Sequence, residues 1–265
     1  TTKETTVTVK VNDPSAEKPE VAADYDFAGA QTGDNTLVDK SENGNDAWLE
    51  GNNITFKDGV MTLGDQSYVE LPLEIMESLD DQEKFTIEVE FAKNKNCGNN
   101  AWLFCLGSKV KSSGTNYMFL SPNFEGKTLR SGIKNSSTEK LFATSTQPEI
   151  DKTYTVNMVF DHGTIRLYWN GIQVKGDNGN ELKSGYSIMD DVVTPGTENG
   201  VLGFIGRSCW APDGYYQGKV SKFKVYNKAL TNDEVQEAYR EPFEKNFKDN
   251  FTVDKILGSK NPSKD

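Results

Sequence analysis

The chain has 265 residues, of which 35% are apolar and 11% aromatic, so it is long enough to bury one large core, and we expect one main domain. Its formal net charge is −11 and its basic residues are scattered, which argues against nucleic acid and anionic membranes as partners and favours neutral glycans. No stretch approaches the ~20 apolar residues of a membrane span, and no secretion signal opens the chain, so we expect no membrane insertion and a segment of a longer protein.

Residues 1–20 are predicted to be the end of a preceding module. Residues 5–11 alternate between apolar and polar side chains like a final strand, and residues 12–20 form a linker rich in charge and proline. The main domain is predicted over residues 21–242. Residues 243–265 are expected to hold a second linker and the start of a following module.

An oxygen-rich loop follows in the first part of this domain. The spacing of Asp39, Ser41, Asn43 and Glu50 nearly matches the spacing of the ligands in a helix-flanked calcium-binding loop. Strands are expected on both sides here, so we interpret the register of the match as coincidence. The side chains nevertheless carry the oxygen donors that calcium prefers.

The central block has a period of two, which is typical of strands that bury one face. Apolar side chains occupy every second position in Phe85–Phe91, in Tyr154–Phe160 and in Ile165–Trp169. Asn170-Gly171 suits a tight hairpin because both central residues of such a turn need a positive φ. An antiparallel meander is therefore predicted over residues 152–175.

Three cysteines, Cys97, Cys105 and Cys209, cannot all pair within one molecule, and none lies in a zinc-binding spacing. Cys97 with Cys105, or Cys105 with Cys209, would be able to form a bridge if the strands bring them together. We favour small buried thiols over either bridge.

An aromatic loop follows the strand that ends near Ile205. Aromatic side chains on a loop that a sheet supports offer flat apolar surface to a sugar ring, while a nearby carboxylate and guanidinium bind its hydroxyl groups. We predict that Trp210, Tyr215 and Tyr216 stack on a sugar and that Asp213 and Arg207 bind its hydroxyl groups. The alternative is a packing lid without a ligand. Further aromatic candidates, whose facing the sequence leaves open, are Trp48, Trp102 and Tyr117.

One segment is predicted to be helical. Thr231 and Glu234 form a capping box, Leu230 and Val235 are placed for a hydrophobic staple, and the helix is expected to seal the end of a sheet. Many short strands and a single late helix favour an all-β fold, a two-sheet antiparallel jelly-roll sandwich with one short C-terminal helix.

The order of these pieces resembles the laminin-G-like, concanavalin A-like lectin family, found as accessory modules of bacterial glycoside hydrolases. The resemblance spans Asp24 to Arg240 and rests on residues 25–27, 39–45, 59–63, 68–72, 85–89, 167–171 and 206–230. It implies a curved sandwich that often binds carbohydrate and often holds a structural calcium ion. The flanks resemble pieces of bacterial immunoglobulin-like repeats, which implies a secreted or cell-wall-attached parent protein.

The resemblance makes the oxygen-rich loop a candidate calcium site. Family members often carry calcium near it, so we predict a structural Ca²⁺ bound by Asp39, Ser41 and Asn43. The family also contributes an acidic pair from its last strand, where this chain has Ser221-Lys222. Loss of those carboxylates weakens the site, and a lysine there would be able to replace the charge of the ion.

Catalysis is not expected. Related β-glucanases carry a Glu-x-Asp-x-x-Glu strand, and this motif is missing. Glu88 and Glu90 share a strand face but are interpreted as solvated carboxylates, and the single histidine, His162, is expected in a hairpin turn.

The sequence therefore predicts a non-catalytic carbohydrate-binding module of a secreted bacterial glycoside hydrolase. Its expected partners are a polysaccharide or host glycan and the covalently linked catalytic and immunoglobulin-like domains. A structural spacer or docking domain is the first alternative, and a glycosidase with an unrecognised site is the second.

Overall fold

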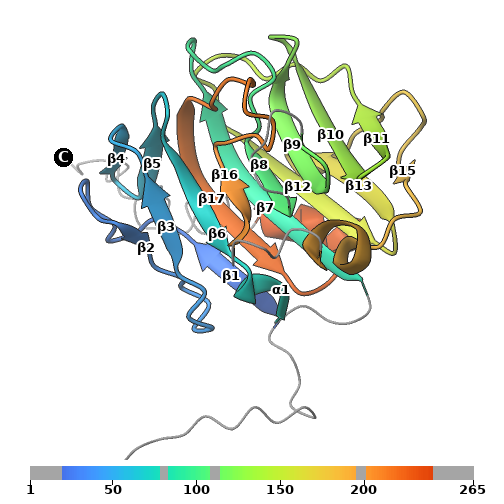
Figure 1. Cartoon of the computed structure of the whole chain (residues 1–265), viewed down its shortest axis with the longest axis horizontal. Coiled ribbons are helices and arrows are strands. Elements are labelled where there is room, and N and C mark those ends of the chain that lie inside the picture. Colours follow the sequence, from blue (N-terminus) through green and yellow to red (C-terminus); the bar gives the residue numbers. More distant parts are fainter. Residues whose placement is uncertain (1–19, 78–82, 108–113, 195–200, 241–265) are drawn as a thin grey trace, which may run out of the picture.

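The computed structural model describes residues 20–77, 83–107, 114–194 and 201–240. They form two packed antiparallel sheets, as predicted (Figure 1). The predicted flanking modules, residues 1–20 and 243–265, lie outside the described residues apart from Glu20.

The first sheet, named the A sheet here, has nine strands. Its order is β14 (Ile172–Gln173), β13 (Thr164–Trp169), β12 (Tyr154–Asp161), β7 (Lys84–Lys93), β17 (Gly218–Tyr226), β5 (Val60–Leu63) and β4 (Ile54–Lys57); β1 (Val21–Tyr25) also pairs with β17, and β15 (Leu182–Lys183) with β13.

The second sheet, the B sheet, has eight strands. Its order is β11 (Thr138–Ala143), β10 (Thr128–Asn135), β9 (Tyr117–Phe124), β8 (Phe104–Gly107), β16 (Val201–Ile205), β6 (Tyr68–Pro72), β3 (Ala47–Glu50) and β2 (Thr36–Leu37).

The main core lies between the two sheets and follows the predicted alternation. Strand β7 sends Ile87, Val89 and Phe91 inward, and the B sheet meets them with side chains such as Phe104 and Leu120. Each of these side chains is fully buried, and burying one apolar side chain of this size stabilises the fold by roughly 1.5–3 kcal/mol.

The outward-facing side of the B sheet is apolar as well, which is unusual for a sheet with one face toward solvent. A second cluster of buried side chains lies there: Trp102, Cys105, Tyr117, Phe119, Phe204 and Cys209. We call this surface the outer B face. The segment between β16 and β17, residues 206–217, lies over part of it and contributes Cys209 and Trp210.

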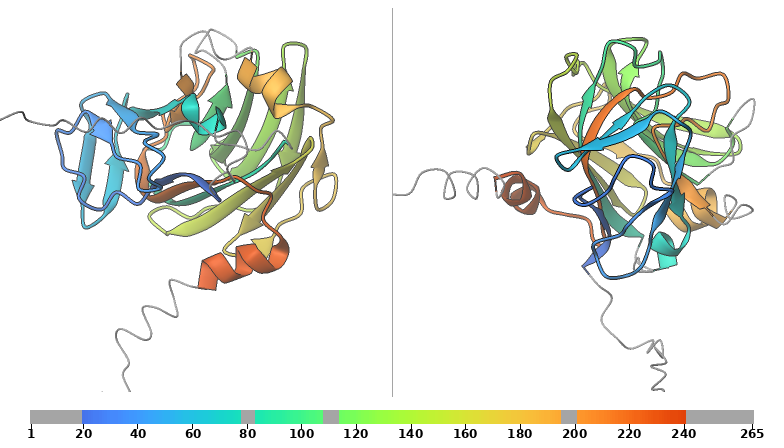
Figure 2. Two further views of the ribbon diagram at one scale, coloured as in Figure 1. Left: turned by 90° about the horizontal axis from the view of Figure 1, so that it is seen from below. Right: turned by 90° about the vertical axis from the view of Figure 1, so that its left-hand side faces the viewer.

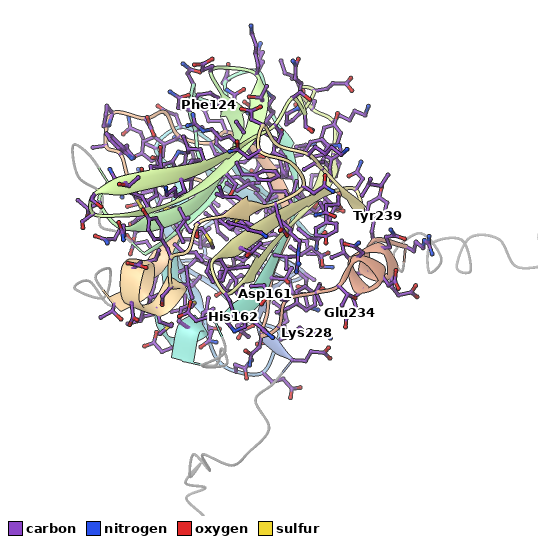
Figure 3. The ribbon with its side chains drawn as sticks, turned by 90° about the vertical axis from the view of Figure 1, so that its right-hand side faces the viewer. Phe124, Asp161, His162, Lys228, Glu234 and Tyr239 are labelled. Atoms are coloured by element: carbon purple, nitrogen blue, oxygen red, sulfur yellow. The ribbon has the colours of Figure 1, made fainter. Side chains whose placement is uncertain are left out.

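The predicted turns of the A sheet are confirmed. Asn170 and Gly171 have φ values of 49° and 77°, and the strands they join pair Trp169 with Ile172. His162, with a φ of 45°, lies in the turn between β12 and β13, where its Nδ1 is 2.7 Å from Asp161 Oδ1 (Figure 3).

The predicted helix spans residues 232–240 and lies against the outer side of the A sheet (Figure 2). Its capping box is reciprocal: Thr231 N donates to Glu234 Oε2 at 2.8 Å and Glu234 N donates to Thr231 Oγ1 at 3.3 Å. Leu230 and Val235 pack with Val159 and Tyr168 of the sheet, as the staple predicts. Two short helical turns of the described residues were not predicted from the sequence, namely α1 (Glu74–Glu77) and the π-helix η1 (Met189–Val193).

Replacing Thr231 by Ala should lower the melting temperature. The substitution removes an N-cap that is worth about 0.5–2 kcal/mol, which corresponds to a decrease of roughly 1–8 °C for a domain of this size. Thr231→Ser keeps the hydroxyl group and should melt within a degree or so of the parent protein. Calorimetry of both variants measures the difference, and equal melting temperatures for the Ala and Ser variants would contradict the capping role.

Candidate functional site

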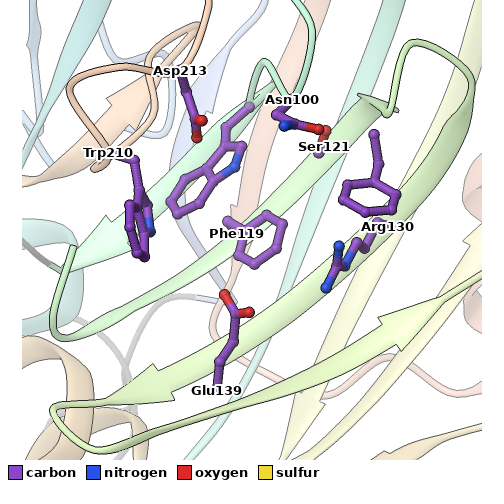
Figure 4. Close-up of a pocket in the computed structure, with 9 residues that line it drawn as sticks. Asn100, Phe119, Ser121, Arg130, Glu139, Trp210 and Asp213 are labelled. Atoms are coloured by element: carbon purple, nitrogen blue, oxygen red, sulfur yellow. The ribbon is translucent and has the colours of Figure 1, made fainter. Parts of the chain in front are cut away.

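A small pocket opens on the outer B face, with a volume of about 160 Å³ (Figure 4). Strands β9, β10 and β11 supply one part of its lining, and the segments that precede β8 and follow β16 supply the rest. The lining residues are Asn100, Trp102, Phe119, Ser121, Phe124, Arg130, Glu139, Trp210 and Asp213.

The floor of the pocket is a pair of stacked rings. The centroids of Trp102 and Phe119 are 4.2 Å apart, with an interplanar angle of 12°, and each residue is only 4% exposed. Tyr117 packs against Trp102 from the same strand as Phe119, with its ring centroid 4.9 Å away. The floor is therefore apolar and held by packing on several sides.

Trp210 forms a wall of the pocket and is held at both ends. Its backbone N–H donates to Ser208 Oγ at 3.0 Å, and its indole Nε1–H donates to Tyr117 Oη at 3.0 Å. Lys134 Nζ lies 5.1 Å from the ring centroid, within range of a cation–π contact. The half-buried indole is thus fixed in orientation by the sheet on which it packs.

Two carboxylates line the pocket among the rings. Glu139 Oε1 accepts a hydrogen bond of 2.6 Å from Tyr117 Oη, and Asp213 Oδ2 accepts one of 2.8 Å from Ser208 Oγ. Burial raises the pKa of Asp213 above its usual range, the hydrogen bond from Ser208 opposes this shift, and the charge of Glu139 adds to it.

A guanidinium group completes the polar set. Arg130 lies over the Phe124 ring, with its Cζ 3.9 Å from the centroid. Its Nε is buried and has no hydrogen-bond partner within the part of the chain that the structure describes. The pocket thus offers both acceptors and donors around an apolar floor, which is the chemistry that recognises a sugar ring.

The structure places two of the five predicted ligand-binding residues, Trp210 and Asp213, in this pocket. Tyr215 and Arg207 lie further along the outer B face. Both contact Tyr68: the Tyr215 ring centroid is 6.2 Å from that of Tyr68, and the Arg207 guanidinium lies 4.5 Å above the Tyr68 ring.

The prediction for Tyr216 is wrong. This residue is 0% exposed, its ring contacts Phe91 edge-on at 6.3 Å, and its O–H donates to the Lys219 carbonyl at 2.9 Å. Neighbouring residues in extended backbone face opposite sides, so Tyr215 points outward and Tyr216 fills the space between the sheets. A ring in that position cannot stack on a ligand.

The remaining aromatic candidates divide in a similar way. Trp102 is part of the pocket floor and Tyr117 packs beside it, whereas Trp48 on β3 is 42% exposed and pairs across the strands with Glu70. Burial raises the pKa of Glu70, nearby Glu50 raises it further, and Arg207 opposes the shift. Aromatic and charged groups therefore extend from the pocket across the outer B face to β3.

Sequence reasoning missed Phe119, Arg130 and Glu139, which come from three strands of the B sheet. Had Tyr117–Leu120 been recognised as a strand, the two-residue period of strands would have placed Tyr117 and Phe119 on one face. No sequence signal, however, indicates which side chains of β10 and β11 lie beside them.

As arranged in the structure, the side chains of the oxygen-rich loop do not fit a calcium ion. The buried Asp39 carboxylate accepts four hydrogen bonds, from Asp24 N, Ser41 N, Ser41 Oγ and Asn45 N, at 2.7–3.1 Å. Asn43 uses its amide N–H groups to bind the Val21 and Ala22 carbonyl oxygens. The oxygens of Asp39 are thus occupied by protein donors, and calcium binding by the chain stays a prediction.

Glu88 and Glu90 lie on the outer side of the A sheet, on the opposite side of the sandwich from the pocket. Glu88 is buried rather than solvated, and it accepts hydrogen bonds from Lys222 Nζ at 2.6 Å and from Tyr226 Oη at 2.8 Å. Glu90 accepts one from Ser221 Oγ. Ser221 and Lys222, at the position where the resemblance implies an acidic pair, therefore serve as partners of these two glutamates.

Two packed antiparallel sheets with this strand order define a jelly-roll β-sandwich. A family model described as "Concanavalin A-like lectin/glucanases superfamily" matches residues 63–236, which is well over half of the chain. The chain belongs to this laminin G type of concanavalin A-like family. No curated protein matches the sequence significantly.

Solved structures share the fold at low sequence identity. Domain 4 of AbnA, a GH43 extracellular arabinanase from Geobacillus stearothermophilus in complex with arabinotriose, is 16% identical with a TM-score of 0.60, and the match covers 83% of this chain and 98% of that domain. The binding domain of botulinum neurotoxin DC, in complex with rat synaptotagmin II, is 17% identical with a TM-score of 0.53, over 84% of this chain and 51% of the toxin chain. A mutant Trypanosoma rangeli sialidase with trans-sialidase activity is 12% identical with a TM-score of 0.61, over 85% of this chain and 34% of the sialidase.

Among the described residues, no helix has the length and apolar character needed to span a membrane. In the same ranges, no group of three or more histidine, cysteine, aspartate or glutamate side chains is arranged to hold a metal ion.

Removing the Asp39 carboxylate should destabilise the domain whether or not calcium is present. Asp39→Ala leaves several buried donors without an acceptor, which should cost about 2–5 kcal/mol of unfolding free energy. If the Asp39 carboxylate keeps these protein donors in solution, chelation of the parent protein should leave its melting temperature unchanged, since only a bound ion adds stability by mass action. A melting temperature that falls in chelator and recovers with added calcium would contradict this account and support the calcium site.

Protonation of Asp213 should favour the folded state. Because burial raises its pKa in the folded protein, the stability gained from this proton is present below the ordinary carboxyl pKa and is lost as the pH rises through the raised value. Asp213→Asn should therefore melt above the parent protein near about pH 7, and this advantage should vanish below about pH 3.5. Thermal melts across this range test the prediction, and a difference that does not change with pH would contradict it.

Proposed function

We propose that this chain is a non-catalytic carbohydrate-binding module of a secreted or cell-wall-attached bacterial glycoside hydrolase, and that it binds its glycan in the pocket on the outer B face. The observation that carries the proposal is the stacked floor of Trp102 and Phe119 beside the indole of Trp210, with carboxylates and a guanidinium around them. Aromatic surface for the ring and charged groups for its hydroxyls are what a sugar requires.

The size of the pocket bears on what it holds. About 160 Å³ is less than the roughly 300–1,000 Å³ of pockets that enclose a drug-sized ligand. We therefore expect it to take one ring of a glycan while neighbouring rings lie on the surface. Trp48 and Tyr215 lie in the direction of β3 and β6 and would offer further contacts to a longer chain.

Two comparisons support a sugar as the ligand. The arabinanase domain that matches over nearly its full length was solved with arabinotriose bound, and it belongs to an extracellular glycoside hydrolase. The family itself joins lectins with glucanases. A single pocket of this size would give modest affinity for a glycan. The linked domains of the parent enzyme would increase the overall affinity by raising the local concentration of the glycan around the module.

A glycosidase is the second candidate, because two carboxylates line one pocket and burial raises the pKa of Asp213, as a general acid requires. Against it, Glu139 and Asp213 are each engaged by a neighbouring hydroxyl group. Release of reducing ends from arabinan and β-glucan, measured for the parent protein and for Glu139→Gln, separates the two functions. Hydrolysis that depends on Glu139 would overturn the binding module.

Trp210→Ala should weaken binding of a glycan without unfolding the domain. Loss of the stacking surface should cost roughly 1–3 kcal/mol, or about 10- to 100-fold in affinity. Asp213→Asn keeps an acceptor and should cost less. A glycan array followed by calorimetric titration, starting with arabinotriose, measures the loss, and thermal melts confirm that the variants are folded.

Two controls separate this outcome from its alternatives. Tyr216→Phe changes an equally aromatic residue of the same loop that faces the core, so it should alter the melting temperature more than the affinity. An array without any bound glycan would indicate a spacer or docking domain. Full affinity in folded Trp210→Ala would show that the ligand binds elsewhere.

A further inference from the structure

Two thiols lie close together beneath residues 206–217, which we call the Trp210 loop. Cys105 lies on β8 and points to the outer B face, and Cys209 directly precedes Trp210 in the segment above it. Their Sγ atoms are 3.2 Å apart, and both residues are 0% exposed. Both are buried thiols in the structure, as predicted, whereas Cys97 is half-buried.

We propose that Cys105 and Cys209 form a disulfide that fastens the Trp210 loop to the B sheet. An S–S bond is about 2.05 Å long, so the two sulfur atoms need to approach by only ~1 Å, which side-chain rotation and a small shift of the loop supply. Cys97 is not needed for the bond.

The chemistry requires an external disulfide as oxidant, such as glutathione disulfide. One thiol loses its proton, and its thiolate attacks a sulfur of that oxidant and releases one reduced glutathione molecule. The second thiolate then attacks the mixed disulfide and releases the other, so that two protein thiols are oxidised and one glutathione disulfide is reduced to two thiols. Because both sulfurs are buried in the folded domain, this exchange takes place during folding or when the loop opens, and the finished bond is shielded from reductants.

The bond would act on both the unfolded and the folded chain. It joins residues that are 104 positions apart, and a cross-link over so long a segment strongly restricts the unfolded chain. In the folded domain it would fix the backbone one residue before Trp210, which already binds Ser208 and Tyr117. If the pocket binds glycan as proposed above, a loop ordered in advance loses less conformational entropy on binding.

The test refolds the full chain once with reduced and oxidised glutathione and once with excess reductant, followed by alkylation of remaining thiols and mass spectrometry. We expect one alkylated cysteine, Cys97, after oxidative refolding, and a peptide that links Cys105 to Cys209. The melting temperature of the oxidised form should exceed that of the reduced form by about 4–15 °C.

Two variants serve as controls. Cys97→Ser should show the same oxidation and the same rise in melting temperature, whereas Cys209→Ala should show neither, although its reduced form should remain folded. Three alkylated cysteines after oxidative refolding, a bond that includes Cys97, or an oxidised form that melts no higher than the reduced one would each overturn the proposal.

The fastening of the loop is tested without any sugar. Amide hydrogen exchange of residues 206–217 should be at least several-fold slower in the oxidised form, while residues of β12 should exchange equally in both forms. Unchanged exchange in the loop would overturn the fastening. Because this readout and the mass measurement do not involve a glycan, failure of the proposed function would leave them unaffected.

Discussion

The site depends on one constraint, namely that both faces of β8 and β9 are apolar. Phe104, Leu106 and Leu120 point into the core, and the alternate positions place Cys105, Tyr117 and Phe119 on the outside. An uncovered cluster of this kind would be an exposed apolar patch, so the segment after β16 folds back over it. The cover is partial, and the pocket lies where Trp210 meets the stacked rings of the floor.

Tyr117 links the apolar and polar parts of this site. It accepts a hydrogen bond from the Trp210 indole and donates one to Glu139, so one residue of β9 orients both a wall and a carboxylate. Burial raises the pKa of Tyr117 far above its ordinary value, the hydrogen bond to Glu139 adds to this shift, and the bond from Trp210 opposes it. The phenol therefore keeps its proton at any physiological pH, and the direction of the two hydrogen bonds is fixed.

Local patterns in the sequence predicted those parts of the fold that depend on neighbouring residues. The alternation of β7, the Asn170-Gly171 turn and the capping box at Thr231 are all local, and all three are confirmed. The site was predicted only in part because it joins strands β9 to β11 with a loop some 70 to 90 residues later. Such pairing follows from sheet topology, which periodicity within one strand does not reveal.

The wrong prediction for Tyr216 and the poor fit of the untested calcium site have physical causes of the same kind. Judged by residue type alone, Tyr215 and Tyr216 are equally good candidates for stacking on a sugar. In the structure the two side chains face opposite sides, and only Tyr215 reaches the surface. The calcium spacing correctly finds oxygen atoms, but it does not show that backbone N–H groups already occupy the Asp39 carboxylate. In both cases the missing information is which partner each group meets in three dimensions.

Both outer faces of the sandwich keep buried side-chain nitrogens without a hydrogen-bond partner among the described residues, namely Asn157 Nδ2 and Arg166 Nε on the A sheet and Arg130 Nε on the B sheet. What distinguishes the outer B face is that aromatic rings line a pocket beside its unsatisfied donor. On the A sheet, Glu88 is paired with Lys222 and Tyr226, and the helix at residues 232–240 packs over Val159 and Tyr168. On the B sheet, the guanidinium of Arg130 keeps a buried Nε without a partner among the described residues, beside a half-buried indole. A buried donor without an acceptor costs free energy that a ligand oxygen would recover, so a glycan bound at the outer B face as proposed would satisfy the Arg130 Nε–H group and stack on the aromatic rings at the same time.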